Sequence, residues 1–117
     1  MKHLVAVYGT LKSGYSNHQL LDKACYIGSD RLTGVTLYNL GPYPGALPKP
    51  SDGVWVEVYA VDDQLLAMLD RLEDYDPRAE KTSLYLRKKV QTRHGQAWVY
   101  LYNRPVRSGQ RIHSGNW

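Results

Sequence analysis

The sequence predicts an α+β fold, in which one curved or barrel-like β-sheet carries two helices. Strand-like segments dominate the chain, and they come in the order strands, short helix, strands, helix, strands. A regular alternation of strand and helix, which would indicate a parallel α/β sheet, is missing from the pattern. The 117 residues, of which 43% are hydrophobic, are enough for one domain over residues 1–117 with a core of its own.

The first third of the chain predicts two strands with a short helix between them. Residues 4–8 form an apolar run that ends at Gly9, as expected of a buried strand. Ser16 followed by Gln19 fits a capping box at the start of a short helix. Residues 31–38 are rich in β-branched side chains, which favours a single strand there.

A rigid loop and an alternating strand are predicted next. Residues 41–45 read Gly-Pro-Tyr-Pro-Gly. Two prolines fix φ and remove amide donors, so we expect an irregular loop of the kind that often lines a site. Residues 54–60 alternate, so their valines should face one side of a sheet while Trp55, Glu57 and Tyr59 face the other.

The second half of the chain predicts a helix followed by a hairpin. Asp62 or Asp63 can cap a helix that continues to about Asp74. Residues 84–92 and 97–102 look like two antiparallel strands joined by a turn. An irregular tail follows.

Charge is distributed unevenly around a net value of +4. Eight acidic residues and one basic residue lie between Asp52 and Asp76, whereas nine basic residues and one acidic residue follow from Arg78 onward. A basic half could attract nucleic acid. We favour a solvated strand face instead, because the basic residues are spread over strand-like sequence and no nucleic-acid-binding motif is present.

Several other site classes find little support. The four histidines lack metal-ligand spacing, and a single cysteine, Cys25, excludes a cysteine-based zinc site; we expect Cys25 to be a small buried side chain. Gly9 and Gly14 have the spacing of a phosphate-binding loop, but the lysine that should follow is missing. No apolar run approaches the length of a membrane span, and the N-terminus does not resemble a signal peptide, so we expect a cytoplasmic location.

One carboxylate of the predicted helix is out of place. On a wheel of about 100° per residue starting at Leu65, Glu73 falls at about +80°, inside the apolar arc. Asp70 and Asp74 fall at about +140° and 180°, on the polar side. A carboxylate that faces apolar surroundings has a raised pKa, which suits proton transfer. The alternative is a frayed last turn with a solvated Glu73. The arc itself is formed by Leu65, Leu66, Met68, Leu69 and Leu72.

Short motifs spread in order over almost the whole chain resemble the γ-glutamylcyclotransferase-like (AIG2-like) family. The resemblance implies a small mixed β-barrel with two flanking helices and a reaction that cyclises a γ-glutamyl amine to 5-oxoproline and free amine, without a metal or other cofactor. The motifs lie at residues 7–12, 17–18, 41–46, 56–59, 69–73, 85–87, 97–100 and 114–117.

The resemblance also assigns roles to residues. The turn Tyr8, Gly9, Thr10 and Leu11 corresponds to the one that binds the glutamyl carboxylate through backbone amides, and Glu73 corresponds to the catalytic glutamate. Wheel and resemblance therefore indicate the same acid by separate routes. From the sequence itself, Tyr43 and Tyr85 are candidates for lining the pocket, with ordinary loop and sheet packing an equal alternative.

Two departures from the family pattern stand out. The family often has glycine after the catalytic glutamate, where this chain has Asp74, and its tail usually reads Gly-Asp-Trp, where this chain has Asn116 in the middle.

Three functions are weighed from the sequence. We favour the cyclotransferase, with a small-molecule γ-glutamyl amine as substrate. A non-catalytic binding module on the same fold is second, and a basic nucleic-acid-binding barrel is third.

Overall fold

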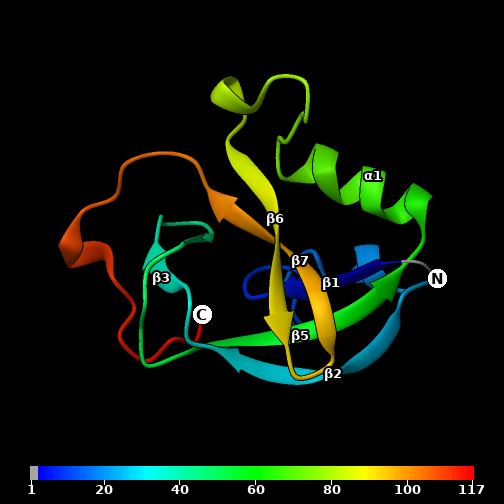
Figure 1. Ribbon diagram of the computed structural model, residues 1–117, viewed down its shortest axis with the longest axis horizontal. Helices are drawn as coiled ribbons and strands as arrows, with labels where there is room; N and C mark the ends of the chain where they lie inside the picture. The colour runs from blue at the N-terminus through cyan, green and yellow to red at the C-terminus, as the bar shows by residue number, and fades with distance from the viewer. Residues whose placement is uncertain (1–2) are drawn as a thin grey trace.

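The computed structural model describes residues 3–117, and strands dominate it (Figure 1). A single α-helix and three one-turn 3₁₀ helices (η) complete the fold, so the second predicted helix is only the short η1. The elements are β1 His3–Val7, η1 His18–Leu21, β2 Cys25–Leu32, β3 Thr36–Asn39, β4 Pro44–Leu47, β5 Val54–Val61, α1 Asp63–Leu72, η2 Glu80–Thr82, β6 Tyr85–Thr92, β7 Gly95–Tyr102 and η3 Ser108–Gln110.

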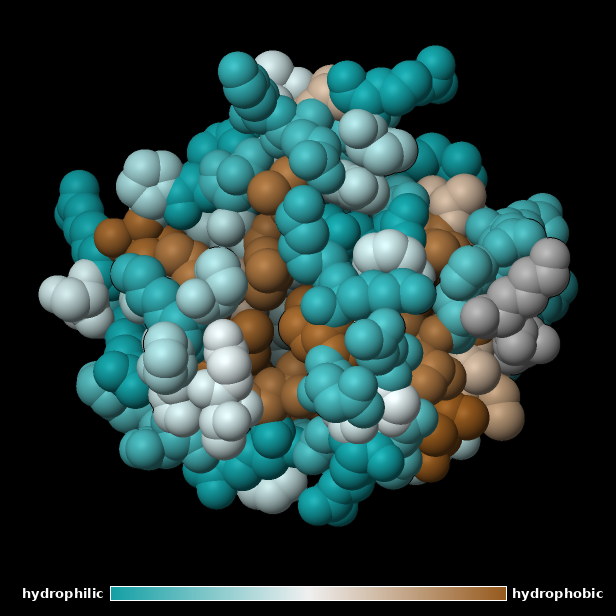
Figure 2. All heavy atoms as spheres, viewed as in Figure 1, coloured by the Kyte–Doolittle hydropathy of each residue, from teal (hydrophilic) through white to brown (hydrophobic). Residues whose placement is uncertain are grey.

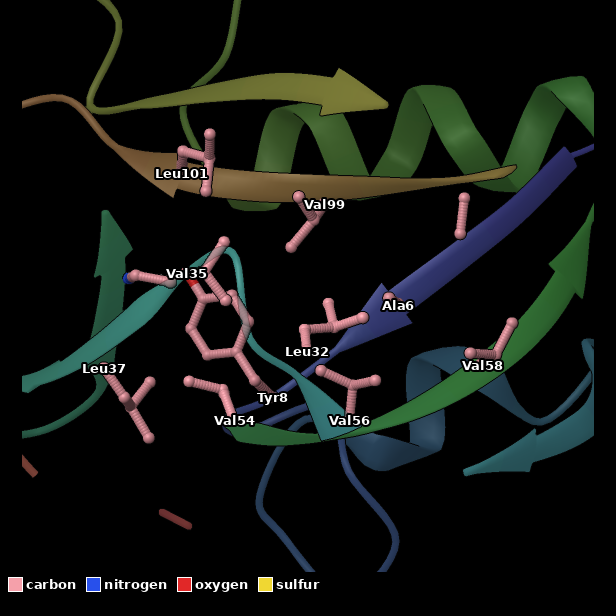
Figure 3. Close-up of a cluster of buried hydrophobic side chains, with 12 residues drawn as sticks. Ala6, Tyr8, Leu32, Val35, Leu37, Val54, Val56, Val58, Val99 and Leu101 are labelled. Carbon is pink, nitrogen blue, oxygen red and sulfur yellow. Dashed lines mark hydrogen bonds between the residues drawn. The ribbon is translucent and has the colours of Figure 1, made fainter. Parts of the chain in front are cut away.

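The alternation of side chains along β1 divides the interior into two cores. Val5 and Val7 pack with the buried leucines of α1, whereas Ala6 and Tyr8, which directly follows β1, join the β5 valines at 54, 56 and 58 and Val99 of β7. Successive side chains of a strand point to opposite faces, so one buried strand serves both cores. Figure 3 shows the second cluster between β5 and β7, with its side chains pointing toward one another.

The seven strands form one mixed sheet in the order β2-β5-β1-β7-β4-β3, with β6 on the other side of β7. Within residues 3–117, β2 and β3 at the two ends of this path do not pair with each other, so the sheet is curved but open. The α+β fold with a curved mixed sheet is thus confirmed, and the expected β-barrel is in the structure an open sheet. On the face seen in Figure 2, hydrophobic residues form patches near the middle, at the left and at the lower right, with hydrophilic residues between and around them.

Strand β7 has a fork in its pairing. Both β1 and β4 run parallel to it on the same side, β1 through Val5 opposite Trp98 and β4 through Ala46 opposite Leu101. The two strands therefore share β7 as a neighbour and separate from each other along it. The fork leaves an opening where the last residues of β1 continue into the turn that begins at Gly9.

Three local expectations differ from the structure. Residues 31–38 are two strands, β2 and β3, separated by a bend at 33–34. Ser16 does not cap η1, whose N-cap is Asn17 without a side-chain bond. The segment 41–45 is not wholly irregular, because Pro44 opens β4; a proline at the first residue of a strand removes no ladder bond.

Other elements agree with expectation. Asp62 caps α1, its carboxylate accepting the Leu65 N–H at 2.8 Å, and the valines of β5 are buried.

Two expectations about burial are wrong. Cys25 was expected to be buried but is exposed, because it opens β2, the strand at one end of the sheet's strand order. Of the predicted apolar arc of α1, Met68 and Leu72 are 41% exposed, so only the three remaining leucines face the core.

Candidate active site

A cavity of about 350 Å³ lies at the fork between β1 and β4, next to the C-terminal end of α1. This volume is at the lower end of the range for small-molecule sites. Among residues 3–117, Glu73 is the only one with a charged side chain that lines the cavity. The cavity is lined by Ala6, Val7, Tyr8, Gly9, Thr10, Leu11, Ser16, Asn17, Pro42, Tyr43, Pro44, Leu72, Glu73, Leu84, Tyr85 and Tyr100.

The backbone at Glu73 is fixed by the way α1 ends. Glu73 is the C-cap, and its N–H donates to Leu69 O at 3.0 Å. The Tyr75 N–H donates to Asp70 O at 2.9 Å and the Asp74 N–H to Arg71 O at 3.2 Å. This pair of bonds, with Asp74 at φ 53, is a Schellman motif. The motif aims the half-buried Glu73 side chain into the cavity rather than leaving it on a frayed turn.

Burial raises the pKa of Glu73 to about 7. Its carboxylate has no hydrogen-bond or ion-pair partner among residues 3–117, so nothing offsets the loss of water around the charged form. A carboxyl group that titrates near neutral pH can both accept and return a proton. This electrostatic situation is what the wheel predicts for an inward-facing acid.

Three tyrosines surround Glu73 without donating to it. The Tyr8 hydroxyl donates to Tyr100 O at 2.6 Å, the Tyr85 hydroxyl to Pro44 O at 2.8 Å, and the Tyr100 hydroxyl to Asp70 Oδ1 at 2.7 Å. Burial, with the nearby Glu73 charge as a further cause, raises the pKa of all three. Their protons are committed elsewhere, which explains why the Glu73 carboxylate stays unpaired.

The turn after β1 offers free amides to the same cavity. Within residues 3–117, the backbone N–H groups of Gly9, Thr10 and Leu11 have no acceptor, although the carbonyls of Gly9 and Thr10 are bonded to the amides of Lys12 and Asn17. Adjacent unpaired amides in a turn form a site for an anion. The turn is held in shape by the side chain of Asn17, which donates to Thr10 Oγ1 at 2.8 Å.

Glycine at position 9 is required by packing within the protein. A Cβ there would lie 2.7 Å from Cγ of Pro44. The proline ring thus rests against the Gly9 backbone and joins the turn after β1 to the start of β4.

All seven residues singled out from the sequence line this one cavity: Glu73, Tyr8, Gly9, Thr10, Leu11, Tyr43 and Tyr85. Tyr43 is 38% exposed and its ring centroid lies 6.4 Å from that of the buried Tyr85. The roles assigned to these residues remain predictions. Tyr100 was missed, although strand alternation over 97–102 places it on the same face as Trp98.

Asp70, which the wheel places on the polar side of α1, is largely shielded from water in the structure. Its side chain is 16% exposed, and it binds Arg87 through two hydrogen bonds, Nε to Oδ1 at 2.8 Å and Nη2 to Oδ2 at 3.1 Å. A helix wheel sees only the helix itself, whereas Arg87 is supplied by β6. Asp74, in contrast, is exposed as expected.

A buried lysine lies just beyond the amide turn. Lys12 is 6% exposed, and its Nζ donates to Asn116 Oδ1 at 2.8 Å. Burial lowers the pKa of Lys12. The tail is tied down further by the Tyr15 hydroxyl, which donates to Trp117 O at 2.5 Å. The contacts link residues at the two ends of the chain next to the cavity.

Neither a metal centre nor a membrane span emerges from the described part of the chain. Among residues 3–117, no three side chains of histidine, cysteine, aspartate or glutamate come together as metal ligands. None of the helices over that range has the length and apolar character that crossing a bilayer requires.

Comparison with known proteins places this geometry in a family. Residues 5–117 match the family model described as gamma-glutamyl cyclotransferase, AIG2-like. A Vibrio cholerae protein with the provisional name gamma-glutamylcyclotransferase is 42% identical over all of this chain and 96% of its own. The gamma-glutamylcyclotransferase family protein YtfP of Escherichia coli K12 is 37% identical over 97% of this chain and 94% of its own.

Solved structures agree with the sequence matches. The crystal structure of an AIG2-like protein from Mus musculus superimposes with a TM-score of 0.81 at 27% identity. The superposition covers 98% of this chain and 87% of the mouse protein. The open mixed sheet with one α-helix is thus shared with a solved relative.

Proposed function

Because the chain belongs to the AIG2-like γ-glutamyl cyclotransferase family, we propose that it cyclises a γ-glutamyl amine to 5-oxoproline and free amine, with Glu73 as the general acid and base. The family and its named relatives support the reaction type. The observation that carries the residue assignment is the position of Glu73: the only charged side chain lining the cavity, without a partner in residues 3–117, and with a pKa of about 7.

The proposed reaction takes place within one substrate molecule. The α-amino nitrogen attacks the γ-carbonyl carbon and forms the ring C–N bond, and the bond from that carbon to the amine nitrogen then breaks. Glu73 takes the proton that the attacking nitrogen loses and gives it to the leaving amine, so no water or cofactor is consumed. Because both reacting ends are tethered, the cavity contributes mainly by folding the substrate into the attack geometry.

The free amides of Gly9, Thr10 and Leu11 are the proposed site for the substrate's α-carboxylate. They lie in the wall of the same cavity as Glu73, and no group of residues 3–117 accepts their hydrogen bonds, so they are available to the substrate. Tyr43 and Tyr85 would then pack against the glutamyl chain or the amine. We propose that one domain over residues 1–117 carries the whole activity. The cytoplasmic location remains a prediction.

The test is release of 5-oxoproline from γ-glutamyl derivatives of an α-amino acid, a lysine side chain, a polyamine and a simple alkylamine. We compare the wild type with Glu73→Gln and with Asp74→Asn, the same acid-to-amide change one residue further on and outside the cavity. Wild type and Asp74→Asn should release product, and Glu73→Gln should lose at least about 10²-fold of the rate. A folded, fully active Glu73→Gln protein would refute the assignment of the base.

The two other functions weighed from the sequence make different predictions in the same assay. A wild type that binds these compounds and releases no 5-oxoproline would be a binding module. Nucleic-acid binding gains no support from the basic half, because several of its side chains are engaged within the fold: Arg87 with Asp70, Arg93 with Asp30, and Arg104 with backbone carbonyls.

A further inference from the structure

We propose that Asp70 and Arg87 are positioning residues that hold the last turn of α1 against the β6–β7 hairpin and thereby keep the Glu73 carboxylate inside the cavity. The inference rests on the proposed function, in which Glu73 is the base. It concerns a polar contact beside the cavity, since neither Asp70 nor Arg87 lines it.

The first observation is how completely Asp70 is bonded. Oδ1 accepts from Arg87 Nε at 2.8 Å and from the Tyr100 hydroxyl at 2.7 Å, and Oδ2 accepts from Arg87 Nη2 at 3.1 Å. The backbone carbonyl of Asp70 also accepts the Tyr75 N–H of the Schellman motif. A single residue thus binds β6, β7 and the chain that leaves the helix. Bidentate arginine–carboxylate pairs fix geometry as well as adding energy.

The second observation is that Arg87 is itself held in place. Its guanidinium carbon lies 4.3 Å from the centroid of the Trp98 ring of β7 and 5.5 Å from that of Tyr75, just beyond α1. The side chains of Arg87 and Asp70 are 15% and 16% exposed. Removing one partner of an ion pair that is largely shielded from water costs more than removing one partner of a surface pair, because the other charge is left buried and unpaired.

The third observation is that α1 has little apolar packing after Leu69, where Asp70 and Arg87 bind each other. This pair of residues is called the clamp below. The buried apolar side chains of α1 are Leu65, Leu66 and Leu69, whereas Met68 and Leu72 are 41% exposed. Leu72 immediately precedes Glu73 and does not anchor it. Glu73 has no partner of its own in residues 3–117, so its location depends on the backbone of this turn. Asp70, one turn earlier, supplies the polar anchor.

The electrostatics of the site is consistent with Asp70 acting as an anchor and Glu73 as the titrating group. Asp70 is an acid three residues from Glu73, but burial alone raises the pKa of Glu73. The adjacent Arg87 offsets the Asp70 charge. The other titratable groups that face Glu73 are three tyrosines: Tyr8 directly after β1, Tyr85 on β6 and Tyr100 on β7.

The experiment uses a charge-neutral double variant, Asp70→Ala with Arg87→Met, which removes both charges of the clamp and keeps an apolar stem on Trp98. The pKa of Glu73 is measured by carbon-13 NMR titration of its carboxyl group, so no substrate is needed. If the clamp holds Glu73 in the cavity, its pKa should fall in the double variant from about 7 toward the ordinary value of 4.5. A value still near 7 in the folded double variant would overturn the proposal.

A kinetic comparison adds a second readout on the best substrate of the 5-oxoproline panel. Misplacing a catalytic group by about 1 Å can cost about 10²-fold, so the single variants Asp70→Asn and Arg87→Met should lower kcat by about that factor with KM within about twofold. Arg87→Lys should recover part of the loss. Arg93→Ala removes the exposed partner of Asp30, and neither of these residues lines the cavity, so this variant is the matched control and should behave as wild type.

The outcomes separate the two proposals. If Glu73→Gln is active, Glu73 is not the base. The NMR titration of Glu73 in the wild type and the double variant then still decides whether the clamp holds the carboxylate in the cavity. An inactive Glu73→Gln protein together with wild-type kcat in Asp70→Asn and Arg87→Met refutes only the clamp. Should the double variant not fold, Asp70→Asn, which removes the charge but keeps the shape of the side chain, decides in its place: an unchanged Glu73 pKa and kcat would reject the clamp.

Discussion

Glu73 and Asp74 are adjacent acids in opposite surroundings: Glu73 points into the cavity, whereas Asp74 is exposed and has a left-handed backbone with φ 53. The C-terminal end of α1 creates this contrast. The Schellman motif ends the helix at Glu73 and turns the chain away at Asp74. Several predictions about the pair can be measured directly.

The pH dependence of the reaction should report the pKa of Glu73. The base must be deprotonated in the free enzyme, so kcat/KM should rise with pH through an apparent pKa of about 7. Asp74→Asn should leave this acidic limb in place. A limb near 4.5 in the wild type would mean that the catalytic carboxyl group is solvated. The measurement is kcat/KM for 5-oxoproline release between pH 5 and pH 9.

Replacing Glu73 by glutamine should stabilise the protein at neutral and higher pH. The folded-state pKa is raised from 4.5 to about 7, so the folded state holds a proton over that window which the unfolded state has lost, and stability falls as the pH rises through it. Above pH 7 the burial penalty of the charged form is complete, and Glu73→Gln should gain about 3 kcal/mol. Below pH 4.5 the gain should vanish. Urea unfolding at pH 4, 6 and 8 tests this trend.

Asp74→Gly should raise stability while leaving turnover intact. Glycine adopts the left-handed conformation without the steric cost that a Cβ brings, and the change also removes a negative charge from the C-terminal end of a helix. We expect a gain of about 0.5–1 kcal/mol in the free energy of unfolding. Asp74→Ala removes the charge but keeps a Cβ, so it should gain less. Equal stability of the glycine and alanine variants would show that the charge alone matters.

Asn116→Asp should strengthen the contact between the tail and the amide turn. The side chain of Lys12 is buried and its amine is bonded to Asn116, which is itself exposed, so an aspartate there would pair with the lysine at little desolvation cost. Charge-assisted bonds are roughly twice as strong as neutral ones, so about 1 kcal/mol is expected near pH 7. The gain should disappear as pH falls below the pKa of the aspartate.

A double-mutant cycle identifies the partner. In a Lys12→Met background the same Asn116→Asp change should bring no gain in the unfolding free energy, measured by the same urea titration. A gain that persists without Lys12 would assign the effect to another group.

Local patterns in the sequence were sufficient for part of this picture. The alternation over β5, the Asp62 cap and the inward face of Glu73 follow from periodicity and capping, which depend on neighbours a few residues apart. Together with the family resemblance, which supplied the turn at residues 8–11, these patterns named seven residues that line one cavity. Local patterns could not predict contacts between residues that lie far apart in the sequence.

Asp70 and Cys25 illustrate what local patterns miss. Asp70 lies on the polar arc of its helix and is nevertheless shielded, because Arg87, 17 residues later, and Tyr100 meet it across the sheet. Cys25 is exposed because its strand is at one end of the strand order, a property of topology rather than of the residue. The fork at β7 is likewise set by how strands far apart in the chain assemble.

The fork has a consequence for how the family could diversify. Where β1 and β4 part, no backbone ladder spans the gap; instead the Tyr8 hydroxyl bridges it, donating to Tyr100 O and accepting from the Ala46 N–H. A ladder would impose one fixed spacing, but a side chain can be exchanged for a longer or shorter one. Variation at the few residues lining this gap, such as 42–44, could therefore retune the pocket for a new amine without re-registering any strand.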